Sequence, residues 1–185
     1  MTCKVLFIQG AGKDAHDTWD IKLVDSLKAH LGDGYEVDFP KMPNEADPHL
    51  SSWKAALHRD FKTMNEGDIL VGHSAGGAIL LHTLADQAPP FIPGALVFLA
   101  IPYIGEGGWP SQDLKPRDDF ADALPVGVPV LMYHGTEDGT VPFVHTRLYA
   151  KAIPQAVITP LKDADHQFKN DLSQVAKDIR ALDKR

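Results

Sequence analysis

Gly72-His73-Ser74-Ala75-Gly76 follows the apolar run 69–71 and leads into a stretch, 75–85, with the composition of a helix. This is the G-x-S-x-G pattern in the strand-to-helix setting that gives it meaning. A serine at the tip of so sharp a turn has strained backbone geometry, and the chain passes close to it on both sides. Glycine lacks Cβ and permits that approach two residues before and two after the serine. The pattern therefore predicts an exposed nucleophile at Ser74 in preference to a plain tight turn.

The acid and the histidine of a catalytic triad are expected after later strands, in that order. The buried-strand run 128–133 leads into a turn that contains Asp138, and a short strand at 157–159 leads into a loop that contains His166. Asp138 is favoured over Glu137 because of its spacing to Val141-Pro142, which opens the next helix. We therefore predict a Ser–Asp–His triad of Ser74, Asp138 and His166.

Apolar segments alternate with helical ones along the chain. We expect strands at 4–8, 36–39, 68–71, 95–100, 129–133 and 157–159. We expect helices at 18–31 (with Asp17-Thr18 as the N-cap), from Ser51 or Ser52 to about 64, at 75–85, near 143–152 and from 172. Strands that are apolar throughout indicate a sheet covered on both faces. The fold class is therefore α/β, a three-layer sandwich with a mainly parallel sheet of about six strands and the site at their carboxyl ends.

With these features the chain resembles the α/β-hydrolase superfamily over nearly its whole length, and within it the small lidless serine hydrolases related to retinoblastoma-binding protein 9. The resemblance rests on the serine elbow, Met42-Pro43-Asn44, Trp53 at the opening of the next helix, and the turns around Asp138 and His166. It implies a hydrolytic triad of Ser74, Asp138 and His166. The chain departs from the superfamily in two places: Gln9-Gly10-Ala11-Gly12 replaces a common His-Gly, and Asp165 replaces a glycine before the histidine.

Acyl transfer to a serine also needs N–H donors for the tetrahedral oxyanion. One expected donor is the Ala75 amide, which begins a helix and so has no intrahelical partner. The other is expected in the loop after the first strand, from Ala11, with Gly12 as its rival. The predicted reaction is hydrolysis of a small carboxylic ester through an acyl-enzyme on Ser74, with an amide or peptide as the second choice.

A chain of 185 residues suits one domain, and we expect a single domain over 1–185. The irregular segment 101–127 contains four prolines and is too short for a separate cap domain, so we expect an open cleft. His16, Tyr103 and Trp109 are predicted to line the substrate pocket. For His16 a solvated loop position, and for Trp109 a surface aromatic that pins a loop, remain as alternatives.

The formal net charge of −7 argues against partners that are nucleic acids or anionic membranes. Cys3 is the single cysteine, which excludes an intramolecular disulfide, and no leader segment precedes the first strand, so we expect a cytoplasmic location. The nine histidines lack metal-ligand spacing, and neither a metal nor a cofactor is expected. The predicted partner is a small acyl substrate, and a protein partner is implied by the resemblance alone.

Other polar residues near these motifs have simpler interpretations. His73 is expected to point away from Ser74 and to be structural, and His134 is expected to form a hydrogen bond at the end of a strand. Asp163 and Asp165 are interpreted as solvated loop charges.

Two other function classes remain open. The residues Gly10 to Ala15 satisfy the dinucleotide fingerprint G-x-G-x-x-A, with Asp38 at the end of the second strand. The late N-cap expected at Asp17-Thr18 argues against it, because the fingerprint's helix begins within the glycines. The other alternative is a non-catalytic protein-binding member on a hydrolase scaffold.

Overall fold

The computed structural model describes residues 2–114 and 116–182. These residues form a sheet of six parallel strands in the order β2-β1-β3-β4-β5-β6. The strands are β1 (Cys3–Ile8), β2 (Tyr35–Asp38), β3 (Ile69–His73), β4 (Ala95–Leu99), β5 (Val130–Gly135) and β6 (Val157–Leu161). Since β2 and β3 lie on opposite sides of β1, the strand order reverses between β1 and β3, and ligand sites of open α/β sheets lie at such a point.

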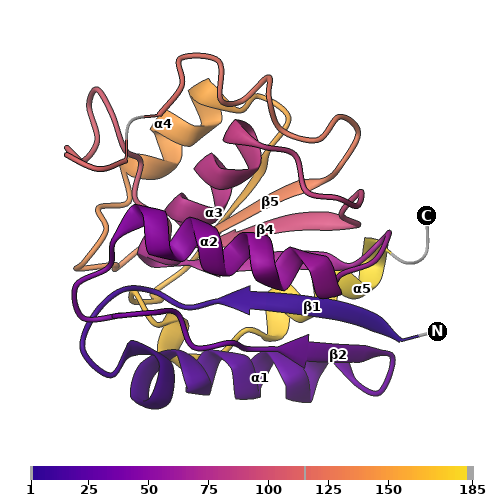
Figure 1. Cartoon of the computed structure of the whole chain (residues 1–185). Coiled ribbons are helices and arrows are strands. Elements are labelled where there is room, and N and C mark those ends of the chain that lie inside the picture. Colours follow the sequence, from indigo (N-terminus) through magenta and orange to yellow (C-terminus); the bar gives the residue numbers. More distant parts are fainter. Residues whose placement is uncertain (1, 115, 183–185) are drawn as a thin grey trace.

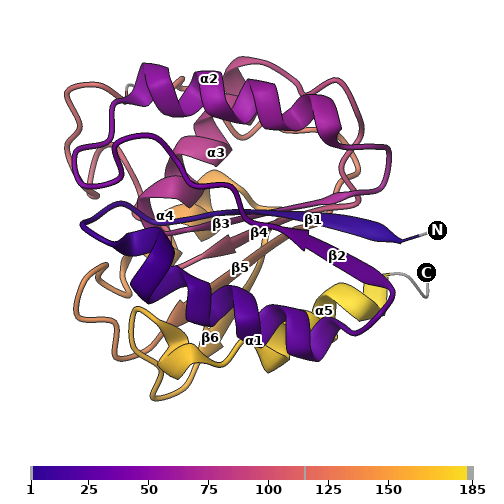
Figure 2. The ribbon, with the colours of Figure 1, turned by 60° about the horizontal axis from the view of Figure 1, so that its bottom comes forward.

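Helices cover both faces of this sheet (Figures 1 and 2). One layer holds α2 (Leu50–Asp60), α3 (Ser74–Asp86) and α4 (His145–Ala152), and the other holds α1 (Ile21–Leu31) and α5 (Ser173–Leu182). Shorter turns are the π-helical η1 (Ala15–Asp20) and the 3₁₀ turns η2 (Phe61–Thr63) and η3 (Phe168–Asn170). The predicted three-layer α/β sandwich is therefore confirmed.

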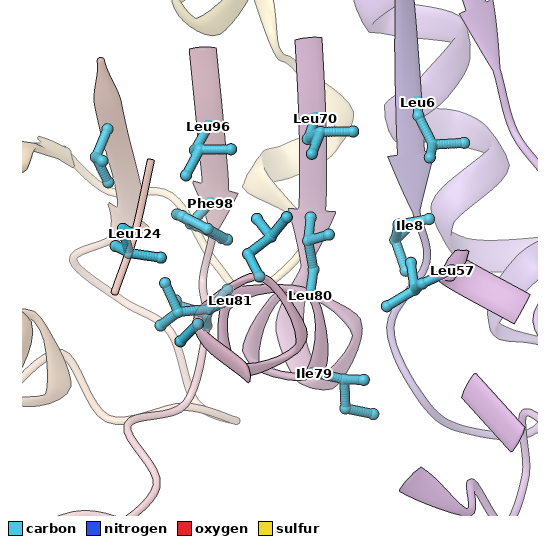
Figure 3. Close-up of a cluster of buried hydrophobic side chains, with 14 of the residues drawn as sticks. Leu6, Ile8, Leu57, Leu70, Ile79, Leu80, Leu81, Leu96, Phe98 and Leu124 are labelled. Carbon is cyan, nitrogen blue, oxygen red and sulfur yellow. The ribbon is translucent and has the colours of Figure 1, made fainter. Parts of the chain in front are cut away.

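Successive residues of each strand point to opposite faces of the sheet, and apolar residues occupy both sets of positions. Figure 3 shows Leu6, Leu70 and Phe98 in the cluster of buried side chains that also holds Leu80 and Leu81 of α3. The intervening strand residues pack on the opposite side against α1 and α5: Val5, Phe7, Val71 and Val97. Burial on both sides makes each central strand apolar throughout and holds the strand ends that carry the site.

The predicted N-caps of two helices are wrong. The helical path before α1 begins at Ala15, two residues before Asp17. Asp17 does not cap the helix, because its carboxylate contacts His16 Nδ1 at 2.6 Å and Lys41 Nζ at 2.5 Å. Helix α2 begins at Leu50, before Ser51 and Ser52, and the Ser52 hydroxyl donates back to the His49 carbonyl at 2.8 Å. In the described ranges, no helix is long and apolar enough to cross a bilayer.

Candidate active site

The sharp turn between β3 and α3 has no loop residue between the two elements. Strand β3 ends at His73, helix α3 begins at Ser74, and Ser74 has φ 51° in the left-handed region. That conformation is strained for a residue with a Cβ. A Cβ on Gly76 would lie 1.9 Å from the Gln9 carbonyl oxygen, and one on Gly72 would lie 2.5 Å from the Gly77 Cα. The glycines of the motif are therefore required by close backbone packing around the serine.

The fold brings Ser74, Asp138 and His166 together in one hydrogen-bonded chain. His166 Nε2 lies 3.0 Å from Ser74 Oγ, and His166 Nδ1 lies 2.8 Å from Asp138 Oδ2. The three residues follow β3, β5 and β6, whose carboxyl ends meet at the same edge of the sheet. The Asp138 side chain is fully buried, whereas that of His166 keeps 16% of its surface exposed. This geometry lets His166 accept the Ser74 proton while Asp138 fixes the imidazole tautomer.

The surroundings of Asp138 favour its ionised form. Its Oδ1 accepts hydrogen bonds from the amides of Thr140 and Val141, each at 2.8 Å. Burial acts to raise the pKa of the Asp138 carboxyl, but hydrogen bonds from His134 and His166 outweigh it and hold that pKa well below its usual range. Glu137, the rival acid, is exposed at the surface. Asp138 is thus the carboxylate that the loop holds against His166.

Two other polar residues near the triad, His134 and Asp165, lie as expected. His134 Nε2 lies 2.9 Å from the Val141 carbonyl oxygen, at the end of β5, and 3.2 Å from Asp138 Oδ2. Asp165 is an exposed loop charge, as interpreted, and its carboxylate also accepts from the amides of Gln167 and Lys169 at 3.0 and 2.9 Å. Asp165 therefore shapes the turn that carries His166.

Both ring nitrogens of His73 have partners other than Ser74, and the partner Asp20 was missed in the sequence. Its Nδ1 lies 2.9 Å from Asp20 Oδ2, and its Nε2 lies 3.1 Å from the His166 carbonyl oxygen. Asp20 carries no motif and lies 53 residues before His73, so its role has no signal in the sequence.

The loop after β1 presents three successive amides beside the serine. The Gly10 amide donates to Asp20 Oδ2 at 2.6 Å, and the Gly12 amide donates to the Glu45 carbonyl at 2.7 Å. Between them, the Ala11 amide has no acceptor among the described residues. Of the two predicted oxyanion donors in this loop, Ala11 therefore has the N–H that is available.

Two cavities flank the turn at Ser74. The first has a volume of about 320 Å³, and its lining combines small and aromatic residues with polar or charged ones: Gly10, Ala11, Gly12, Lys13, Ala15, Trp19, Asp20, His73, Ser74, Thr140, His166 and Gln167. The second, of about 310 Å³, is lined by apolar residues together with Ser111, Gln112 and Asp113: Pro48, Leu50, Ala75, Ala78, Ile79, Pro102, Ile104, Trp109, Pro110 and Leu114. A larger cavity of about 910 Å³ between segment 121–131, β6 and α5 has no triad residue in its lining.

Of the three predicted pocket residues, Trp109 lines a cavity next to the serine. Tyr103 does not: its ring packs edge-on against Tyr149 in the core, at 5.1 Å between ring centroids. His16 is directed elsewhere, because its ring stacks on Phe39 at 4.1 Å and both ring nitrogens have partners, Asp17 and the Phe39 carbonyl. The expectation that Tyr103 and His16 line the pocket is thus not met by their packing.

The described residues offer neither a set of metal ligands nor a fully free set of amides for a phosphate. Within residues 2–114 and 116–182, three or more His, Cys, Asp or Glu side chains do not gather as a ligand set. In the Gly10–Ala15 fingerprint, two of the amides that a pyrophosphate would need already donate to Asp20 and to the Glu45 carbonyl.

Residues 5–125 match the model of the alpha/beta hydrolase family. No curated protein matches the chain in sequence. The ydeN gene product from B. subtilis is similar in structure, with a TM-score of 0.77, 19% identity and 100% of both chains covered. Est1E from Butyrivibrio proteoclasticus has a TM-score of 0.71 and 17% identity, covering 99% of this chain and 88% of Est1E. The esterase domain of a Rhodothermus marinus protein has a TM-score of 0.67 and 19% identity, covering 99% of this chain and 87% of that domain. At these identities the likeness is one of fold.

Proposed function

The chain belongs to the alpha/beta hydrolase family, and we propose that it is a serine hydrolase that cleaves a small carboxylic ester through an acyl-enzyme on Ser74. The observation that carries the proposal is the continuous hydrogen-bond chain from Ser74 Oγ through His166 to Asp138, at 3.0 and 2.8 Å. A free serine hydroxyl is a poor nucleophile at neutral pH, and this chain supplies the base that it needs.

The mechanism follows from the donors and acceptors in that chain. Asp138 accepts the Nδ1 proton of His166, which leaves the Nε2 lone pair directed at the Ser74 hydroxyl. As Ser74 Oγ attacks the ester carbonyl, His166 takes its proton and then delivers it to the departing alkoxide. Water attacks the acyl-enzyme with the same base, and the acid leaves as Ser74 recovers its proton.

The oxyanion of each tetrahedral intermediate needs two donors close to Ser74. The Ala75 amide lies in the first turn of α3, where N–H groups lack intrahelical acceptors. The unpaired Ala11 amide in the loop after β1 supports Ala11 over Gly12 as the second donor. Removing one such donor typically costs about 3 kcal/mol of transition-state stabilisation.

The two cavities support a division of the substrate at the scissile bond. The cavity that includes Ala75, Ile79 and Trp109 suits a short hydrocarbon or aromatic group, whereas the other cavity offers the Lys13 and Gln167 side chains to a polar substituent. An ester remains the first choice, with an amide or peptide second. We also propose a single domain without a cap, because the described part of 101–127 forms turns and one isolated bridge between Ile104 and Trp109.

The finer likeness to hydrolases related to retinoblastoma-binding protein 9 is also a proposal. Two of the sequence features that suggested it, Met42-Pro43-Asn44 and Trp53, are in contact, since the Trp53 indole donates to the Pro43 carbonyl at 2.7 Å. A small acyl substrate as partner and a cytoplasmic location are proposed on the sequence grounds given above. The dinucleotide alternative loses support because the Gly10 and Gly12 amides already have acceptors.

Labelling with a fluorophosphonate probe tests the proposed function, because this probe reacts with an activated serine. We expect wild-type protein and the control Ser51→Ala, which changes an exposed serine of α2, to be labelled equally. Ser74→Ala should lose both labelling and ester hydrolysis. Equal labelling of Ser74→Ala and wild type would rule out Ser74 as the nucleophile.

A further inference from the structure

A second aspartate–histidine pair lies directly behind the proposed triad. His73 is the last residue of β3, and Asp20 is the last residue of η1. Their side chains are each 1% exposed, and His73 Nδ1 lies 2.9 Å from Asp20 Oδ2. The proposed mechanism uses neither side chain, so this buried polar pair needs an explanation of its own.

The pair connects three of the segments that build the site, those that carry Ser74, His166 and Ala11. His73 Nε2 lies 3.1 Å from the His166 carbonyl oxygen, and His73 immediately precedes Ser74 in the chain. Asp20 Oδ2 accepts the amide of Gly10 at 2.6 Å, next to Ala11, and Asp20 Oδ1 lies 3.3 Å from Gln167 Nε2. The proposed nucleophile, base and oxyanion loop are therefore all connected through these two residues.

The partners of His73 determine its protonation. A carboxylate oxygen and a backbone carbonyl oxygen can only accept hydrogen bonds, so both ring nitrogens of His73 must donate. A neutral imidazole has one N–H, whereas the imidazolium has two. With Asp20 ionised, the geometry thus fits a buried imidazolium paired with the Asp20 carboxylate.

The charged neighbours agree with this assignment. Burial acts to lower the pKa of His73, but the Asp20 carboxylate outweighs burial and raises that pKa above its ordinary value. Burial likewise acts to raise the pKa of Asp20, and the charge of His73 outweighs it and lowers that pKa. The other titratable groups that face His73 are His166, whose ring centroid lies 4.9 Å away, and Asp138, whose charge also favours the imidazolium.

We propose that Asp20 and His73 form a buried ion pair that positions His166 and the oxyanion loop against Ser74. They act through these groups, and His73 and Asp20 are positioning residues. The inference rests on the proposed function for its kinetic consequence, whereas the charge state of His73 can be measured without any substrate.

The charge state is tested by long-range ¹H–¹⁵N NMR spectra of the histidine rings, with His73 assigned by the loss of its signals in His73→Gln. We expect both ring nitrogens of His73 to be protonated near neutral pH in the wild type. In Asp20→Asn, which keeps the shape but removes the charge, His73 should become neutral with one unprotonated nitrogen. A neutral His73 in the wild type, or an imidazolium that persists in Asp20→Asn, would overturn the proposal.

The positioning role is tested by steady-state kinetics with matched controls. Asp68→Asn removes another buried carboxylate, which accepts from the amides of Lys4 and Asn65 at the opposite end of β3. His82→Gln changes another buried histidine, in the middle of α3. We expect Asp20→Asn and His73→Gln to lower kcat roughly 10- to 100-fold with little change in KM, as for small misplacements of catalytic groups.

The same comparison separates the two proposals. The pH profile of kcat should change in Asp20→Asn and His73→Gln, while both controls keep the wild-type profile. Site variants that behave like the controls would refute the positioning role, provided that Ser74→Ala abolishes hydrolysis. If Ser74→Ala keeps wild-type hydrolysis, the proposed function fails and the NMR result alone decides on the ion pair. Should Asp20→Asn not fold, the wild-type spectrum still decides.

Discussion

The carboxylate of Asp138 gathers more hydrogen-bonding groups than its proposed role strictly needs. Two backbone amides and the His166 ring donate to it, and His134 Nε2 lies 3.2 Å from Oδ2. Such a set of donors makes the orientation of His166 depend on one buried side chain. We therefore expect a large loss of kcat from a change at Asp138 that removes the charge and keeps the shape of the side chain.

Asp138→Asn should lower kcat by about 10⁴-fold, the loss found for the same exchange in a serine protease triad. An asparagine amide facing Nδ1 favours the wrong imidazole tautomer, so Nε2 can no longer accept the Ser74 proton. Glu137→Gln, one residue earlier and exposed, is the control and should keep wild-type kcat. A loss of less than tenfold in Asp138→Asn would contradict the proposed role of Asp138.

The turn between β3 and α3 is the element in which sequence, strain and function coincide. Four features occur within a few residues: the left-handed Ser74, the close-packed Gly72 and Gly76, and the helix start that presents the Ala75 amide. Because Gln9, directly after β1, packs against Gly76, this turn also fixes the start of the proposed oxyanion loop.

Gly76→Ala should therefore damage both stability and activity. Its Cβ would lie 1.9 Å from the Gln9 carbonyl oxygen, a backbone atom directly after β1 that cannot rotate away as a side chain would. We expect a loss of at least about 1–3 kcal/mol in the free energy of unfolding, measured by urea denaturation. Gly34→Ala is the control, since a Cβ there has no atom within 4 Å, and it should be neutral in both measurements. A fully active, stable Gly76→Ala would show that this close packing is not required.

Helix α3 also carries a buried histidine that should make stability depend on pH. Burial lowers the pKa of His82 to about 4 from its ordinary value of 6.5, and its Nδ1 has no hydrogen-bond partner among the described residues. Between these values the unfolded chain binds a proton that the folded chain does not, so stability falls as the pH falls from about 6.5 to about 4.

The size of this effect follows from the shift in pKa. A shift of this order corresponds to about 3 kcal/mol of stability. Urea denaturation across this pH range should give a smaller dependence for His82→Leu than for wild type. The same exchange at the exposed His49 should leave the dependence unchanged. Equal slopes for wild type and His82→Leu would mean that His82 does not titrate in this way.

At the scale of the whole molecule, the fold could be predicted because its signals are local or periodic. Apolar strands and a glycine pattern fixed by backbone contact indicated the parallel sheet, its two helical layers and the position of Ser74. The order of Asp138 and His166 along the chain indicated where their side chains would meet. Each of these signals lies within a single segment or a single strand end.

The remaining parts of the site depend on contacts between distant segments. Asp20 meets His73 across 53 residues, and the Gly12 amide is engaged by Glu45, so neither partner can be read from spacing. Tyr103 and His16 were predicted to line the pocket because they lie in suitable loops, but aromatic packing directs both rings elsewhere. Asp17 resembles an N-cap in sequence, yet Lys41 and His16 take its carboxylate.

The central claim is that Ser74 carries the acyl group during turnover, and the most direct test is to identify the acylated residue. The protein would be quenched with acid during hydrolysis of p-nitrophenyl acetate, digested and examined by mass spectrometry. We expect one acetyl group on the peptide that contains Ser74, and we expect neither this adduct nor turnover in Ser74→Ala. Turnover with the acetyl group on another residue, or undiminished turnover in Ser74→Ala, would contradict it.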